Sequence, residues 1–112
     1  MSPDDKPLVK LIGITTPPMS SDARQVCGYL LRLVQQGETL TMPQSRPMPS
    51  IGSNCHELRI TDKDNKWRIV YCVLSDHILV IHVFKKKTQK TPKETIDFCK
   101  SKLASYLNSL ES

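Results

Sequence analysis

The chain has 112 residues and a net charge of +5, with 38% hydrophobic and 24% charged residues. This length allows one domain with a single modest core, and the composition is that of a folded chain rather than a disordered one. The longest apolar-rich run, residues 77–84, is too short to cross a bilayer, and residues 1–5 lack the basic and apolar regions of a signal peptide. We therefore expect one domain over residues 1–112 and no membrane partner.

The cysteines give no sign of a metal site or a disulfide scaffold. The four are Cys27, Cys55, Cys72 and Cys99. No CxxC pair occurs, and the separations of 28, 17 and 27 residues match no zinc-ribbon or zinc-finger spacing. Each cysteine falls in an apolar pattern, where a reduced thiol behaves as a small hydrophobe. Because no glycine-rich phosphate loop is present either, we expect neither a metal nor another cofactor.

The N-terminal half predicts a strand, a helix and a loop. Residues 8–14 are rich in branched apolar side chains and predict a short strand. Apolar residues then recur at spacings of three and four, which predicts an amphipathic helix over residues 21–36 that ends near Gly37. Residues 37–53 contain three prolines and predict an irregular loop, unusually long for a compact domain.

The C-terminal half predicts three strands and a helix. Residues 56–60 alternate between apolar and charged side chains, and residues 67–74 and 78–84 are rich in strand-forming residues. The short polar connections indicate an antiparallel meander. Thr91-Pro92-Lys93-Glu94 is typical of a capping box and predicts a helix over residues 92–108. The fold class is therefore α+β, with two helices on an antiparallel sheet of about four strands.

Positive charge gathers in the second half of the chain. Residues 54–112 carry eleven basic and seven acidic side chains, against five and four in residues 1–53. Five lysines fall within nine residues: Lys85, Lys86, Lys87, Lys90 and Lys93. Such a segment suits a polyanion such as nucleic acid, although a simple solvated face gives the same pattern.

Two arginines on consecutive predicted strands could join these lysines. Arg59 and Arg68 lie on the two strands of a hairpin, and Arg46 lies in the long loop. An arginine offers phosphate a planar fork of donors, so this surface could hold a phosphodiester. Tyr71 and Trp67 could stack on bases, or could instead form one core face together with Ile69.

His56 and Glu57 are the acid–base candidates beside this surface. Cleavage of RNA without a metal uses the 2′-hydroxyl as nucleophile, and needs a proton acceptor, a proton donor and cations for the charge on phosphorus. A histidine suits either proton transfer because its ordinary pKa is near neutral. The alternatives are that His56 faces the core beside Leu58, and that Glu57 pairs with Arg59 or Arg68 and holds it in place.

Three segments in this order, residues 56–60, 67–71 and 83–92, resemble the RelE/HigB toxin superfamily, closest to its HigB-type branch with phage-derived toxin-like proteins. The resemblance implies a RelE-like fold with a helix before and after the sheet, and the toxin of a bacterial, cytoplasmic type II toxin–antitoxin pair. Such toxins cut mRNA in the ribosomal A site without a metal. A cognate antitoxin, expected to carry a helix-turn-helix, covers the active surface.

The resemblance also assigns roles to individual residues. It implies that Arg68 grips the scissile phosphate, and that Arg59 and Lys86 take family positions that are basic. With His56 these form the expected catalytic set. The expected RNA-binding residues are Arg46, Tyr71, Lys85, Lys87 and Lys90.

Two departures from the RelE pattern leave alternatives open. Glu57 stands where RelE has a lysine, and the C-terminal tyrosine of RelE is absent because a helix begins there. The acid–base assignment of RelE therefore does not transfer. The alternatives to an mRNA endonuclease are a gyrase inhibitor like the related ParE toxins and an inactive module that binds RNA or antitoxin.

Overall fold

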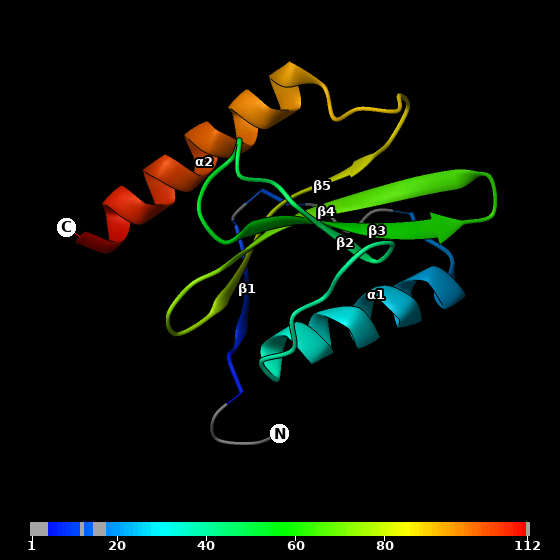
Figure 1. Cartoon of the computed structure of the whole chain (residues 1–112), viewed down its shortest axis with the longest axis horizontal. Coiled ribbons are helices and arrows are strands. Elements are labelled where there is room, and N and C mark those ends of the chain that lie inside the picture. Colours follow the sequence, from blue (N-terminus) through cyan, green and yellow to red (C-terminus); the bar gives the residue numbers. More distant parts are fainter. Residues whose placement is uncertain (1–4, 12, 15–17, 112) are drawn as a thin grey trace.

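The computed structural model describes residues 5–11, 13–14 and 18–111 and contains one five-stranded sheet (Figure 1). The elements in chain order are β1 Leu8–Lys10, α1 Ser21–Gln35, β2 Ser45–Pro47, β3 Cys55–Asp62, β4 Asn65–Val73, β5 Ile78–Lys85 and α2 Lys93–Glu111. Their spatial order in the sheet is β1-β5-β4-β3-β2. The predicted α+β class is confirmed.

The sheet is mixed rather than wholly antiparallel. Strands β2 to β5 pair antiparallel, which confirms the predicted meander, but β1 pairs parallel to β5. β1 is also shorter than the expected strand at residues 8–14, of which residue 12 lies outside the described part. The fifth strand, β2, arises within the loop expected at residues 37–53. It tolerates Pro47 because an edge strand leaves one row of N–H positions unpaired.

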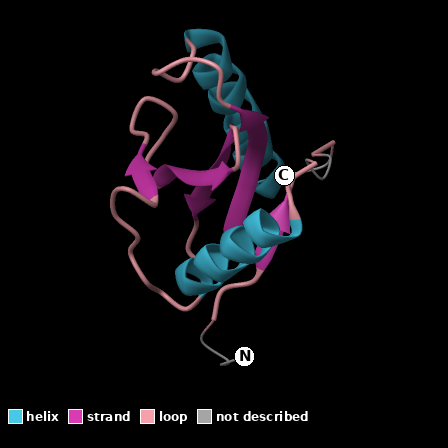
Figure 2. Ribbon diagram, turned by 90° about the vertical axis from the view of Figure 1, so that its right-hand side faces the viewer, coloured by secondary structure: helices cyan, strands magenta, loops and turns pink. Residues whose placement is uncertain are grey.

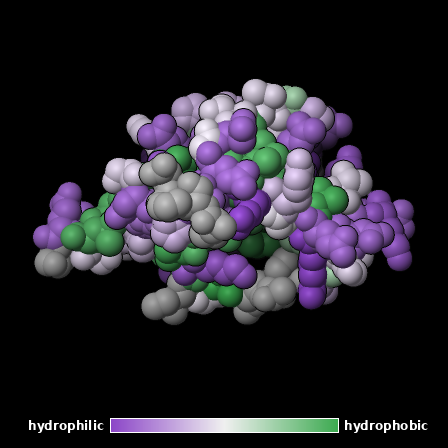
Figure 3. Space-filling view, turned by 90° about the horizontal axis from the view of Figure 1, so that it is seen from below, coloured by the Kyte–Doolittle hydropathy of each residue, from purple (hydrophilic) through white to green (hydrophobic). Residues whose placement is uncertain are grey.

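The two helices cover opposite faces of the sheet, so they do not form one layer (Figures 1 and 2). The core under α1 includes Leu58, Ile69 and Tyr71, and the core under α2 includes Cys55 and Val70. Consecutive residues of one strand therefore pack into different layers, as strand geometry requires. Seen from the α1 side, the described surface mixes hydrophilic and apolar side chains (Figure 3).

The polar residues that precede the two helices, Ser20 and Thr91, make different hydrogen bonds. Ser20 caps α1, because its hydroxyl accepts a hydrogen bond from the Ala23 backbone N–H at 3.1 Å. The predicted start of α2 at residue 92 is corrected to Lys93, and Pro92 precedes the helix. The capping-box pattern leads one to expect the Thr91 hydroxyl as a hydrogen-bond acceptor for the first backbone N–H groups of α2. Its hydroxyl is instead turned toward the sheet, where it donates to the Glu57 carboxylate.

Candidate nucleic-acid interface

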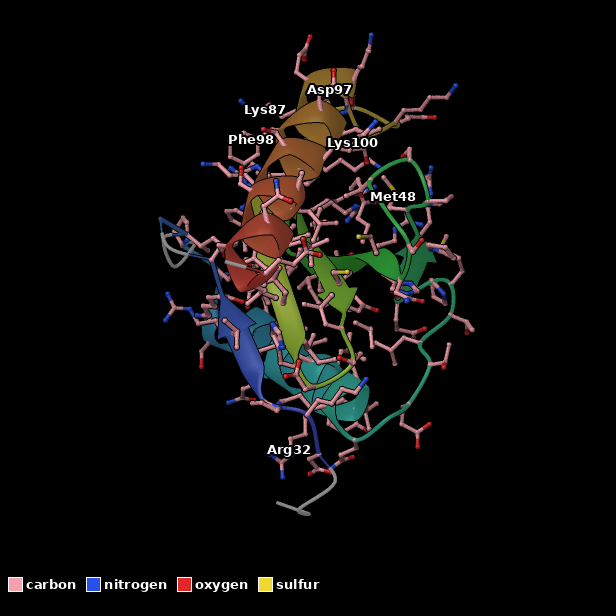
Figure 4. All side chains as sticks on the ribbon, turned by 90° about the vertical axis from the view of Figure 1, so that its left-hand side faces the viewer. Arg32, Met48, Lys87, Asp97, Phe98 and Lys100 are labelled. Atoms are coloured by element: carbon pink, nitrogen blue, oxygen red, sulfur yellow. The ribbon has the colours of Figure 1, made fainter. Side chains whose placement is uncertain are left out.

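A cationic cavity of about 470 Å³ opens where β5 leads into the segment before α2. Seven residues line it: Arg59, Lys66, Arg68, Lys86, Lys87, Thr88 and Gln89. Five of the seven are basic and none is a carboxylate, so the cavity attracts anions. Figure 4 shows Lys87 near the start of α2, at the end of the molecule away from Arg32. We call this feature the cationic cavity.

Strand pairing brings these side chains together. Arg59 on β3 lies directly opposite Arg68 on β4, which confirms that the two arginines approach one another across the hairpin. Lys66 shares a face with Arg68 because it is two residues away on the same strand. The backbone N–H of Lys86 donates to the Lys66 carbonyl at 2.7 Å and continues the pairing of β4 with the end of β5.

Arg68 is fixed by buried partners on the α2 side of the sheet. It is only 3% exposed, and its Nε atom lies 3.5 Å from Oε1 of the fully buried Glu57. Its Nη1 atom donates to the Trp67 carbonyl at 3.0 Å. The other oxygen of Glu57 accepts a hydrogen bond from the Thr91 hydroxyl at 2.5 Å. The interpretation that Glu57 pairs with Arg68 and holds it in place is therefore confirmed.

The crowding of cations changes their protonation energetics. Burial lowers the pKa of Lys86, and the charge of Arg68 lowers it further, whereas Glu57 opposes the shift. Burial also lowers the pKa of Arg68, with a smaller contribution from Arg59. An arginine nevertheless stays charged at neutral pH. The ammonium group of Lys86 is thus a stronger acid than that of an ordinary lysine.

His56 lies on the other face of the sheet from Arg68. It stacks on Tyr71 with ring centroids 5.2 Å apart, and both line a separate cavity of about 150 Å³ beside Val34 of α1. The expectation that His56 works together with Arg68 is wrong, because β3 turns consecutive side chains to opposite faces. The alternative, in which His56 faces the α1 layer beside Leu58, is the one observed.

Tyr71 is not available to stack on bases. It is 2% exposed, and its hydroxyl shares a 2.7 Å hydrogen bond with the buried Ser45 hydroxyl. Trp67 is 5% exposed, and both rings belong to the core under α1. The predicted RNA-binding role of Tyr71 is therefore replaced by the core alternative.

The remaining predicted cations divide into two groups. Lys87 lines the cationic cavity together with Lys86. Arg46 is exposed on β2 opposite Glu57, close enough to lower the pKa of Lys86, but it does not line the cavity. Lys85 instead places its Nζ atom 5.8 Å from the centre of the Trp67 ring. Lys90 is exposed outside the lining residues, and its carbonyl accepts a hydrogen bond from the Thr88 hydroxyl.

Sequence reasoning missed Lys66, Thr88 and Gln89 as lining residues. The position of Lys66 could have been found, because the alternation of β4 places it on the same face as Arg68. Thr88 and Gln89 follow β5 in an irregular segment that has no periodicity. No sequence pattern indicates which way such side chains point.

Two half-buried histidines make stability depend on pH. Burial lowers the pKa of His56 and of His82, which packs between Phe84 and Phe98, below the ordinary value of about 6.5. The folded state then binds fewer protons than the unfolded state just below that value, so stability falls as the pH drops below about 6.5. Urea midpoints should be lower at pH 5.5 than at pH 7.5, and His56→Gln with His82→Gln should flatten this difference. An equal fall in the double variant would contradict the assignment.

Within the described residues, no helix has the length and hydropathy needed to cross a membrane, and no three His, Cys, Asp or Glu side chains cluster suitably for a metal ion. The four cysteines are free thiols. The five basic side chains that line the cationic cavity make it the clearest candidate site for an anionic ligand.

Comparison with known proteins gives one family. The family model described as "Phage derived protein Gp49-like (DUF891)" matches residues 18–104. No curated protein matches the sequence. The matched range includes both arginines, Glu57, Thr91 and all seven residues that line the cationic cavity. The chain thus belongs to the Gp49-like family of phage-derived proteins, a family related to toxin–antitoxin systems.

Proposed function

We propose that this protein is the toxin of a type II toxin–antitoxin pair, and that it cleaves mRNA in the ribosomal A site without a metal ion. The observation that carries the proposal is the cationic cavity, in which four basic side chains surround the buried Arg68, which pairs with Glu57. The family match supports a toxin–antitoxin role, and the resemblance of the strand segments to RelE/HigB toxins supports RNA as the substrate.

The proposed reaction uses the 2′-hydroxyl of the substrate. Its oxygen attacks phosphorus and forms the O2′–P bond, while the P–O5′ bond breaks and leaves a 2′,3′-cyclic phosphate. Arg68 and Arg59 stabilise the additional negative charge on the phosphoryl oxygens. The 2′-hydroxyl gives its proton to water, because no histidine or carboxylate lines the cavity. The departing 5′-oxygen takes a proton from the ammonium group of Lys86, whose pKa is lowered by burial and by the charge of Arg68.

RNA binding at this site should depend strongly on salt. For single strands, the slope of log K against log salt concentration is about −0.7 for each neutralised phosphate. Lys86→Ala should therefore weaken binding of a short single-stranded RNA and reduce the steepness of this slope by about 0.7. Fluorescence anisotropy at several salt concentrations measures it. Lys100→Ala is the matched control, since Lys100 is exposed on α2 outside the cavity. Equal slopes for both variants would contradict a phosphate contact at Lys86.

A second candidate function follows from the same lining. The absence of a histidine or carboxylate among the residues that line the cavity also suits a module that binds RNA or antitoxin without cutting it. The two functions separate in one assay. An RNA bound with the expected salt dependence but left intact in translating extracts would favour the binding module.

A further inference from the structure

A second cavity, of about 280 Å³, adjoins the cationic cavity. Its lining residues are Pro43, Gln44, Arg59, Thr61, Lys66 and Arg68. Three of these, Arg59, Lys66 and Arg68, also line the cationic cavity, so the two cavities adjoin, and we call them together the groove. The second part differs in chemistry, because Gln44 and Thr61 add uncharged hydrogen-bonding groups.

Strand register explains the course of this groove. The backbone N–H of Arg59 donates to the Gln44 carbonyl at 2.9 Å, and this bond extends the pairing of β2 with β3 by one residue. Gln44, Arg59 and Arg68 therefore form a row across adjacent strands, on the α2 side of the sheet. Thr61 lies opposite Lys66, whose backbone carbonyl accepts the hydrogen bond from the Lys86 backbone N–H. Thr61, Lys66 and Lys86 therefore form a second row beside the first.

The rows run across the strands and are long enough for more than one nucleotide. From Lys86 at the end of β5 to Gln44 before β2, they cross three strand spacings of about 4.8 Å, or roughly 14 Å. Successive stacked nucleotides of one strand rise by only about 3.4 Å. A phosphate held by Arg68 and Lys86 therefore leaves the Gln44 end of the groove for a neighbouring nucleotide.

We infer that Gln44 reads the nucleobase adjoining the phosphate held by Arg68, and so sets the sequence preference of the protein. This inference rests on the proposed function. A carboxamide presents a donor and an acceptor side by side, which matches the paired N6 donor and N7 acceptor of adenine. The Thr61 hydroxyl supplies a further donor or acceptor, and the Pro43 ring supplies an apolar surface for the base.

Gln44→Ala tests the inference without disturbing the sheet. The Gln44 side chain is exposed, and its strand contact uses only the backbone carbonyl. The wild-type protein should cut preferentially beside one base, with adenine favoured, and Gln44→Ala should reduce this preference about tenfold. Mapping of cleavage sites across cellular mRNA measures the preference. Gln25→Ala is the matched control, because Gln25 is exposed on α1.

A binding assay separates failure of this inference from failure of the proposed function. Short RNAs that vary at one base carry a single 2′-deoxynucleotide beside it, so they bind without being cut. If Arg68→Lys abolishes cleavage but Gln44→Ala keeps the wild-type preference in both assays, base reading by Gln44 is overturned and the endonuclease proposal stands. If the wild type leaves mRNA intact and Arg68→Lys binds RNA as tightly as the wild type, the proposed function itself is overturned.

Discussion

Replacing Arg68 by lysine should reduce RNA cleavage by about 100-fold or more while the fold persists. Lysine keeps a positive charge opposite Glu57, but it lacks the planar fork that arginine offers to phosphoryl oxygens. Loss of one preorganised donor to a transition-state anion commonly lowers the rate by about 100- to 1,000-fold. We propose that Arg68 is such a donor, because Glu57 and the Trp67 carbonyl contact its guanidinium in the absence of substrate.

The matched control for this variant is Arg32→Lys. Arg32 is exposed on α1 at the far end of the molecule from the cationic cavity (Figure 4). Single-turnover cleavage of mRNA on programmed ribosomes measures both variants, and circular dichroism verifies their fold. Cleavage by Arg68→Lys at the wild-type rate would remove Arg68 from the reaction.

Replacing Glu57 by alanine should lower the free energy of unfolding by about 3–5 kcal/mol, because it leaves the buried Arg68 charge without its partner. This is a large part of the roughly 5–15 kcal/mol available to a domain. Thr91→Val should cost less, about 1.5–3 kcal/mol, since it removes one hydrogen bond to a charged group. Urea unfolding measures both, and Glu94→Ala on the exposed first turn of α2 is the control.

A double-mutant cycle shows whether Glu57 and Arg68 act as a unit. Each single alanine variant leaves one buried group unmatched, whereas the double variant removes both. The double variant should therefore be less destabilised than the sum of the two single variants. Additive effects would mean that the 3.5 Å approach of the two groups contributes no coupling.

Periodicity made most of the fold predictable. The apolar spacing of residues 21–36 predicted α1 to within one residue of its observed ends. The alternation of residues 56–60 predicted the central part of β3. β2 was not predicted, because a strand of three residues that includes a proline is too short to show an alternating pattern. It exists through its partners, including the hydrogen bond of Ser45 to Tyr71. The parallel pairing of β1 depends on β5, which lies some seventy residues away in the chain.

The candidate site was predictable within one strand and across the β3–β4 hairpin, and unpredictable where it depends on β2, a strand that the sequence pattern does not reveal. Alternation alone places Arg59 and Glu57 on one face and His56 on the other, so the expected role of His56 conflicted with the pattern that was already visible. Lys66 could have been added by the same rule. Gln44 could not, because its place beside Arg59 depends on the pairing of β2 with β3.

Primer extension on an abundant mRNA, after induced expression in bacteria, tests most directly whether the protein cleaves mRNA at the cationic cavity. Wild type, Lys86→Ala and the control Lys100→Ala are compared. We predict cuts within translated codons for the wild type and Lys100→Ala, and their loss in Lys86→Ala. Intact mRNA in cells whose growth stops would contradict an endonuclease and favour inhibition of gyrase. Cuts at the wild-type level in Lys86→Ala would contradict the placement of catalysis in the cationic cavity.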